Sequence, residues 1–241
     1  MAKTKRRVNQ LRDISVKRRY TNKAPGSVLF RGGDTVVLCT ASIEESVPHW
    51  MKGSGRGWIT AEYNMLPSST SPRKRRDRSK VDGRTTEIQR LIGRSIRAVA
   101  DLDALGERSI SIDCDVLQAD GGTRTASITG AMIACVDALH SIRKDLPDPQ
   151  KYPLRDSVAA VSVGVVAGRC YLDLDYELDY AADVDMNVVM TGGKQFVEIQ
   201  GTGEEATFDD AQLQSMLSLA GQGIRQLTNI QKTALGARWP W

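Results

Sequence analysis

The sequence predicts an α+β protein in which helices cover mixed β-sheets. Segments whose apolar residues recur every two positions alternate with segments of helical period, in the order strands, helix, strand, helix, strands, helix. Of the 241 residues, 41% are hydrophobic and 26% are charged, which is typical of a globular protein. No apolar run approaches the roughly 18 residues of a membrane span, and no linker divides the chain. We therefore expect a single domain over residues 1–241 and no membrane segment.

The N-terminal part of the chain is predicted to begin with strands. The basic segment 1–23 lacks the apolar stretch of a secretion signal, and its hydrophobic residues are typical of the start of a strand. Apolar residues alternate with others over 26–40 around a Gly-Gly-Asp turn, which predicts a β-hairpin. The glycine-rich segment 51–57 and the Ser/Pro/Arg-rich segment 66–80 predict loops.

Two predicted helices flank a strand in the middle of the chain. Apolar residues fall at helical spacing over 85–105, and Gly106 follows as a stop signal. Apolar and polar residues alternate over 109–117, as expected of a strand with one buried face. A glycine-containing loop at 119–125 then leads into a second helix over 126–142.

The C-terminal part is predicted to contain four strands and a long helix. The strands are expected at 158–166, 170–176, 184–191 and 196–200. The last helix covers about 209–235, where Asp209 can cap the first turn and Gln212 stands at the capping-box position.

Positive charge is concentrated in two short segments of the chain. Residues 1–23 contain nine Lys or Arg against one acid, and residues 73–80 contain six against one. The remainder holds 18 basic and 27 acidic residues, although the whole chain carries a net charge of +4. Such segments attract polyanions in a salt-dependent way, so nucleic acid is a candidate partner. The alternative is a solvated basic loop at 68–82 and a frayed N-terminal tail.

The junction between the strand at 109–117 and the following helix has the features of an anion site. Glycines allow a sharp turn there, and a helix N-terminus offers backbone N–H groups with positive partial charge. Arg124 adds a planar set of donors suited to phosphate, and Arg84 at the start of the other helix could reach the same anion. No Gly-Lys-Ser/Thr follows, so this is not a Walker A loop. A plain strand-to-helix turn with a solvated Arg84 is the alternative.

Acidic residues are crowded into the segment that follows Leu172. The 13 residues contain five aspartates, namely Asp173, Asp175, Asp179, Asp183 and Asp185. Two close carboxylates repel each other unless a proton or cation joins them, and hard oxygen ligands suit Mg²⁺ or Mn²⁺. If the strands around 172 and 187 form a hairpin, Asp179 and Asp185 converge; the alternative is an acidic hairpin facing water.

Other kinds of site are not favoured by the sequence. The four cysteines form no C-x-x-C pair and the chain has two histidines, which argues against structural zinc and for free thiols in a reducing cytoplasm. Ser127 has no histidine nearby for a Ser-His-Asp site. Tyr63 could stack on a nucleic-acid base, with packing in the core as the preferred interpretation.

Four segments together resemble the bacterial ribonuclease PH family. They are SGRGWITAEYNMLP at 54–67, GRTTEIQRLIGRSIRAVADL at 83–102, DCDVLQADGGTRTASITGA at 113–131 and LDLDY…DMNVVMTG at 172–192. The resemblance extends in order from about Asn9 to Leu235. It implies a ribosomal protein S5 domain 2-like fold and a tRNA nucleotidyltransferase, that is, a phosphate-dependent 3′→5′ exoribonuclease. It further implies that inorganic phosphate is the co-substrate, that tRNA precursors and ribosomal RNA are substrates, and that a homohexameric ring forms as a trimer of dimers.

The resemblance also implies roles for individual residues. Phosphate binding is implied for Arg84, Gly122, Thr123 and Arg124. Binding of Mg²⁺ or Mn²⁺ is implied for Asp179 and Asp185. RNA binding is implied for Arg73, Arg75 and Arg76. The candidate catalytic residues are therefore Asp179, Asp185, Arg84 and Arg124.

The sequence departs from the family pattern at a few positions. Leu178 and Tyr180 replace the Glu and Ser that usually flank the matched aspartate, and Ser68 replaces a frequent Arg. These changes favour one alternative function, a catalytically silent RNA-binding ring subunit. A second alternative is a hydrolytic metal nuclease, which would release nucleoside monophosphates and would not need Arg84.

Overall fold

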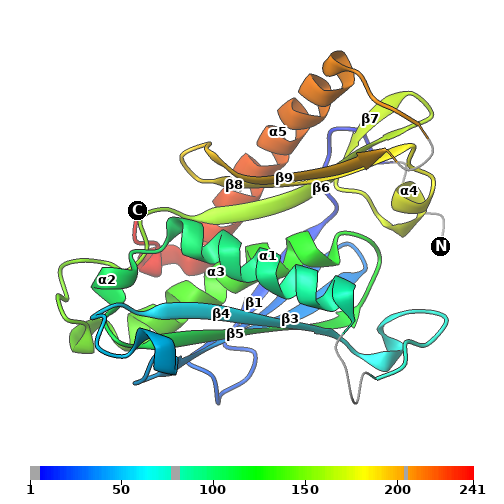
Figure 1. Cartoon of the computed structure of the whole chain (residues 1–241). Helices are drawn as coiled ribbons and strands as arrows, with labels where there is room; N and C mark the ends of the chain where they lie inside the picture. The colour runs from blue at the N-terminus through cyan, green and yellow to red at the C-terminus, as the bar shows by residue number, and fades with distance from the viewer. Residues whose placement is uncertain (1–5, 77–81, 204–205) are drawn as a thin grey trace.

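The computed structural model contains two β-sheets in separate layers, with helices between them and outside the second sheet (Figure 1). It describes residues 6–76, 82–203 and 206–241. Part of the basic loop expected at 68–82 and the first five residues of the basic N-terminal segment therefore lie outside the described residues. Within the described chain, no helix combines the length and hydrophobicity that crossing a bilayer requires. The mixed sheets and layered helices confirm the predicted α+β fold class.

The first sheet has five strands in the order β1-β2-β3-β5-β4. Its strands are β1 (Ile14–Arg18), β2 (Gly26–Gly32), β3 (Thr35–Glu44), β4 (Trp58–Met65) and β5 (Ser109–Gln118). The predicted hairpin is confirmed, because β2 and β3 pair antiparallel and Gly33 turns between them with a φ of +58°. The pair β4 and β5 is parallel, which a helical crossover between the two strands makes possible.

The second sheet has four antiparallel strands in the order β7-β6-β8-β9. Its strands are β6 (Val158–Val166), β7 (Arg169–Leu172), β8 (Val184–Thr191) and β9 (Phe196–Gly203). The expected strand at 170–176 is wrong beyond residue 172, because Asp173 takes a left-handed φ of 58° and ends it. A short helix follows, α4 (Tyr176–Tyr180), whose first turn is capped by the side chain of Asp175.

The acidic hairpin expected between residues 172 and 187 does not form. Strands β7 and β8 pair with opposite edges of β6 instead of with each other. The helix α4 lies between them in sequence, so Asp179 is helical and Asp185 lies on a strand.

The helices differ from expectation at their ends. They are α1 (Gly83–Val99), α2 (Leu102–Leu105), α3 (Thr123–Ser141) and α5 (Asp210–Leu235), with short 3₁₀ turns at His49–Met51, Pro67–Ser69, Arg143–Asp145 and Gly236–Arg238. The single helix expected over 85–105 is broken at Ala100, which forms a β-bridge with Leu154. Helix α3 begins three residues before the predicted start, which places Arg124 in its first turn. The capping box of α5 is confirmed.

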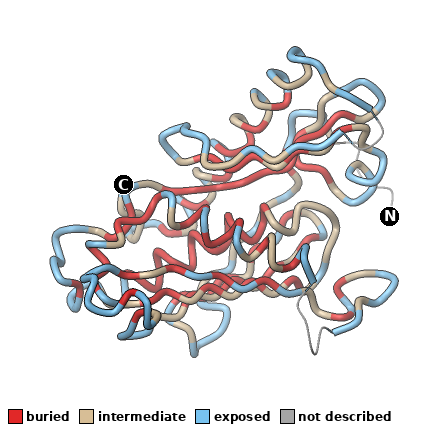
Figure 2. Tube along the Cα trace, viewed as in Figure 1, coloured by how far each residue is buried: buried red, intermediate tan, exposed pale blue. Residues whose placement is uncertain are grey.

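Helix α3 is the centre of the hydrophobic core. Every residue from 125 to 139 is buried, because α3 packs on β2 and β3 below and on β6 above. Figure 2 shows this concentration of buried residues between the sheets. Small residues permit the close approach: a Cβ added at Gly130 would lie 2.7 Å from Cys39 Sγ, and one added at Gly26 would lie 2.0 Å from Ala134 O.

A buried carboxylate ties α3 to both ends of the chain. Asp137 in α3 is 1% exposed and accepts hydrogen bonds from Arg18 Nε at 2.7 Å and from Arg238 Nη1 at 2.7 Å. Arg18 Nη1 also donates to Ala234 O at the end of α5. Burial alone would raise the pKa of Asp137, but the hydrogen bonds from Arg18 and Arg238 outweigh it and hold the pKa below its ordinary value.

We predict that Asp137→Asn lowers the free energy of unfolding by about 3 kcal/mol or more at pH 7, because it leaves two arginines without their carboxylate. Since the folded-state pKa of Asp137 is depressed, this contribution is present above the ordinary value of 3.8 and is lost as the pH falls through the folded-state pKa. Urea unfolding from pH 7 to pH 3 should show the difference between wild type and variant shrinking.

The matched control is Asp103→Asn, which removes an exposed ion pair with Arg56 at 3.0 Å. This variant should lower the free energy of unfolding by less than about 1 kcal/mol at every pH. A difference between wild type and Asp137→Asn that does not change with pH would contradict the assignment.

Candidate active site at two helix N-termini

The turn before α3 brings a backbone segment to the edge of the core. Gly121 and Gly122 have φ values of +73° and +62°, a left-handed region that glycine adopts without strain. A Cβ added at Gly121 would lie 2.6 Å from Leu174 O, so the turn packs closely on the segment after β7. The N-cap, Gly122, offers no side-chain acceptor to the first-turn amides of α3. Such an N-terminus is suited to an anion.

A second helix begins beside this turn. The carboxylate of Asp82 accepts a hydrogen bond from Thr85 N at 2.6 Å and caps α1, and this bond lowers the pKa of Asp82. Arg84, in the first turn of α1, is exposed. The buried Tyr63 hydroxyl lies 2.9 Å from Thr123 Oγ1 of α3.

Arg84 stands in the first turn of α1 and Arg124 in the first turn of α3, and Glu87 of α1 contacts Arg124. Burial, the largest influence, raises the pKa of Tyr63, while the charges of both arginines lower it. The structure thus brings together Arg84, Gly122, Thr123 and Arg124, the four residues predicted to bind phosphate.

This concentration of positive charge is unfavourable without an anion. A cation in the first turn of a helix opposes the helix dipole, and here two helices each carry an arginine in that position. Two guanidinium groups near one hydroxyl also repel each other. A dianion such as phosphate reverses the sign of all these interactions, so the arrangement is suited to phosphate.

Two residues that the sequence analysis missed orient Arg124. Its Nη1 donates to Gln200 Oε1 at 2.8 Å and to Glu87 Oε2 at 3.3 Å. Gln200 Nε2 donates to Glu87 Oε1 at 3.3 Å, which closes a triangle between α1, α3 and β9. Glu87 stands three residues after Arg84, a helical spacing that could have indicated a shared face. No local signal identifies Gln200, which is 76 residues from Arg124.

Asp185 lies on the face of the second sheet that is turned toward Arg124. Asn187 pairs with Gln200, the partner of Arg124, and Asp185 is two residues earlier on the same strand. Residues two apart on a strand share a face. Asn187 also pairs with Ser162, whose Oγ would lie 3.7 Å from a Cβ at Gly122.

Asp179 lies on α4. The helix ends at Tyr180, and β8, which bears Asp185, begins at Val184. Among the described residues, no three His, Cys, Asp or Glu side chains form a group that could hold a metal ion. Two carboxylates still fit Mg²⁺, which usually keeps several waters and takes one or two carboxylates together with substrate phosphates.

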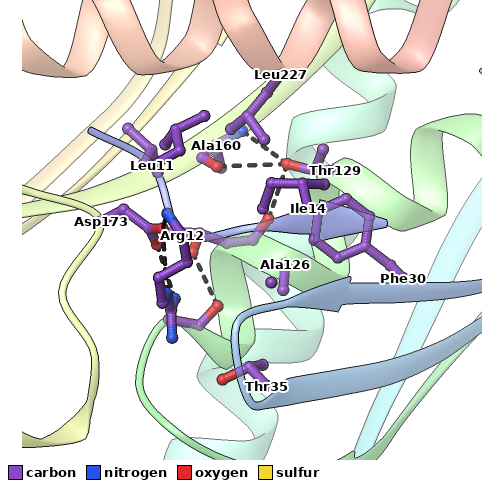
Figure 3. A pocket seen from close by; sticks show the side chains of 14 residues that line it. Leu11, Arg12, Ile14, Phe30, Thr35, Ala126, Thr129, Ala160, Asp173 and Leu227 are labelled. Carbon is purple, nitrogen blue, oxygen red and sulfur yellow. Dashed lines mark hydrogen bonds and ion pairs between the residues drawn. The ribbon is translucent and has the colours of Figure 1, made fainter. Parts of the chain in front are cut away.

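A buried ion pair holds the glycine turn against the segment before α4. Arg12 donates to Asp173 Oδ2 from its backbone N at 2.8 Å and from Nε at 3.1 Å, and from Nη2 to Oδ1 at 2.7 Å. Figure 3 shows Arg12 beside Asp173. Arg12 Nη1 also donates to Asp120 O. The cavity beside Arg12 has a volume of about 20 Å³, room for about one water and far too small for a nucleotide.

The two basic segments have different environments. Arg73, Arg75 and Arg76 are exposed on the loop before α1. In the N-terminal segment, by contrast, arginines are used inside the fold: Arg6 donates to Asp173 O at 2.7 Å, and Arg12 and Arg18 bind buried carboxylates. Three of the nine basic residues at 1–23 therefore bind groups inside the fold, and the alternative of a frayed tail is wrong for the described part of this segment.

Sequence comparison identifies relatives over nearly the whole chain. Models of the 3′ exoribonuclease family match residues 10–140 (domain 1) and 156–223 (domain 2). The chain is 64% identical over 232 residues to a ribonuclease PH of Rhodopirellula baltica, covering 94% of both chains. It is 56% identical over 234 residues to a ribonuclease PH of Listeria innocua, covering 96% of this chain and 94% of the relative.

Solved structures share the fold at lower identity. Rrp46 of rice (Oryza sativa) matches with a TM-score of 0.78 and 17% identity, covering 96% of this chain and 98% of that one. A chain of the Archaeoglobus fulgidus exosome with RNA bound to its active site matches with a TM-score of 0.77 and 22% identity, covering 93% and 90%. These matches show a common fold.

We predict that Arg12→Ala lowers the free energy of unfolding by about 3 kcal/mol or more, because it leaves the buried carboxylate of Asp173 with only its longer pair to Arg6 at 3.6 Å. The control is Arg31→Ala, which removes an exposed pair with Asp34 and should cost about 1 kcal/mol at most. Urea unfolding measures both. Equal stabilities of the two variants would contradict the central role of the Arg12–Asp173 pair.

Proposed function

This chain belongs to the 3′ exoribonuclease family, and we infer that it is a phosphate-dependent 3′→5′ exoribonuclease of the ribonuclease PH type. An oxygen of inorganic phosphate bonds to the phosphorus of the last linkage, and the bond from that phosphorus to the preceding 3′-oxygen breaks. The 3′-oxygen takes up a proton, and a nucleoside diphosphate leaves. The reverse reaction adds a nucleotide. The observation that carries this function is the position of Arg84 and Arg124 in the first turns of α1 and α3, two helices that the contact between Glu87 and Arg124 joins.

We propose that these two helix starts hold the attacking phosphate. Arg84 and Arg124 would bind its oxygens from two sides, and the backbone of Gly122 and Thr123 would add N–H donors. Glu87 and Gln200 would keep the guanidinium of Arg124 in place, since they accept hydrogen bonds from one of its nitrogens. Rate enhancement then comes mainly from positioning phosphate in line and from charge stabilisation.

We propose that Asp179 and Asp185 hold a divalent cation, Mg²⁺ or Mn²⁺. The support is the position of Asp185 on the face turned toward Arg124 and of Asp179 just before the same strand. Bound there, the cation would neutralise charge on the scissile phosphoryl group and on the leaving 3′-oxygen.

We further propose the partners that the family resemblance implies. The substrates would be 3′ trailers of tRNA precursors and ribosomal RNA in the cytoplasm, and Arg73, Arg75 and Arg76 would bind the RNA backbone. Their exposure on the loop before α1 is consistent with this role. The working assembly would be a homohexameric ring built as a trimer of dimers.

A catalytically silent ring subunit is the less favoured function. The chain is 64% identical to a ribonuclease PH over 94% of its length, and it retains the arginines and aspartates that the reaction needs. A hydrolytic nuclease is disfavoured by the 64% identity to a ribonuclease PH, and it would need no site for free phosphate.

The test is product analysis on a tRNA with a short 3′ trailer, in Mg²⁺, with and without phosphate. We predict nucleoside diphosphates that appear only with phosphate, and a loss of about 100-fold or more in rate for Asp179→Asn at nearly unchanged thermal stability. Monophosphates formed without phosphate would establish hydrolysis instead. Near-normal phosphorolysis by Asp179→Asn would overturn the metal assignment.

We predict that Arg84→Ala raises the KM for phosphate about 10- to 100-fold, because it removes a charge-assisted hydrogen bond of about 1.5–3 kcal/mol. Arg90→Ala, an exposed arginine on the same helix, is the matched control and should leave this KM unchanged. Initial rates at varied phosphate measure both. An increase confined to the KM for RNA would assign Arg84 to the RNA backbone.

A further inference from the structure

Helix α4 presents two large aromatic rings to solvent. Tyr176 is 61% exposed and Tyr180 is 83% exposed. They are four residues apart on the helix, and their rings stack with centroids 6.2 Å apart and planes inclined by 25°. Because Tyr176 covers one face of the Tyr180 ring, the high exposure of Tyr180 leaves its other face to solvent.

A backbone hydrogen bond and close packing join the helix that bears the two tyrosines to the candidate active site. Tyr176 N donates to Asp120 Oδ1 at 3.3 Å, which joins the start of α4 to the turn that precedes α3. The chain before α4 also packs on Gly121, where an added Cβ would lie 2.6 Å from Leu174 O. Asp179 is on the same short helix, adjacent in sequence to Tyr180. Figure 1 shows α4 beside the end of the second sheet.

We propose that Tyr176 and Tyr180 form a stacking platform for a base near the 3′ end of the RNA substrate. This proposal rests on the proposed function, since it places the base beside the phosphate site and Asp179. Aromatic side chains bind single-stranded nucleic acid by stacking on the flat face that every base has. The platform would therefore bind RNA without selecting its sequence, as an exonuclease that removes successive nucleotides requires.

The charge of the surrounding surface explains why stacking suits this position. Glu177, next to Tyr176 in the sequence, is exposed and repels the phosphates of RNA. An uncharged ring can hold a base there while the backbone phosphates lie toward the arginines. The exposed charge of Glu177 distinguishes this surface from the core of a protein–protein interface, where charged residues are depleted.

The test compares RNA binding by variants that differ in stacking ability. Tyr180→Leu keeps an apolar side chain but removes the aromatic face, and Tyr180→Phe restores that face. Removing one stacked base costs roughly 5- to 150-fold in binding. We expect the Kd of a fluorescent RNA 12-mer, measured without phosphate, to rise about tenfold for Tyr180→Leu. Tyr180→Phe should restore most of the lost affinity, and the KM for phosphate should not change.

A second arm locates the contact by removing bases from the RNA. One abasic nucleotide is placed in turn at each of the last few positions of the 12-mer. At the position that stacks, wild-type protein should lose the same factor that Tyr180→Leu loses on intact RNA, and Tyr180→Leu should lose nothing more. The control is Phe196→Leu, which removes an aromatic ring that is 50% exposed on β9 and should bind every RNA like wild type.

Several results would overturn the platform. The first is an unchanged Kd for Tyr180→Leu. The second is a loss of affinity in Tyr180→Leu that is equal on intact RNA and on RNA abasic at any position. The third is a change in the sedimentation mass of Tyr180→Leu, which would assign the rings to contacts between protein subunits. The binding assay does not depend on turnover. Protein that binds RNA through Tyr180 but releases no diphosphate would therefore contradict the proposed function and leave the platform standing.

Discussion

The buried ion pair between Arg12 and Asp173 is the interaction on which the geometry of the site depends. It joins three segments that are far apart in the chain: the N-terminal segment, the turn at 120–121 and the residue that ends β7. Both side chains are under a tenth exposed, so desolvation is costly and only several simultaneous hydrogen bonds offset it. Because Asp173 also occupies a left-handed conformation, the pair fixes the point where strand β7 gives way to α4.

The complete burial of α3 is the second constraint. A helix enclosed by sheets on both sides must carry apolar or small residues all round, and α3 does so from 125 to 139 except at Asp137, whose carboxylate binds Arg18 and Arg238. Its polar N-terminus is then the part of α3 left at the edge of the core, beside the start of α1. The two helix starts lie at one edge of the first sheet, because α1 follows β4, α3 follows β5, and these two strands are parallel neighbours.

The candidate site combines opposite charges from different layers. The two helix starts supply arginines, whereas β8 carries Asp185 on the facing side of the second sheet and α4 carries Asp179. Gln200 of β9 and Glu87 of α1 bridge the layers through Arg124. A free phosphate and a phosphodiester are both negatively charged, so a reaction between them needs positive charge where they meet. Arginines can supply this charge directly, and carboxylates can supply it by binding a metal cation. The exposed rings of Tyr176 and Tyr180 on α4 add an uncharged surface beside these charged groups.

The sequence by itself determined the elements whose signal is local. Strands β6 and β8 lie where alternation predicted them, and the capping box of α5 follows from Asp209 and Gln212, because these patterns involve residues two to four positions apart. The family resemblance further indicated the arginines, glycines and aspartates of the candidate site. Tertiary structure decided what depends on distant partners: the pairing of both β7 and β8 with β6, and the placement of Gln200 against Arg124. It also decided that Arg6, Arg12 and Arg18 bind buried carbonyl and carboxylate oxygens inside the fold. The physical reason is that burial and long-range hydrogen bonds arise only when the layers pack, whereas periodicity and caps are present in the chain itself.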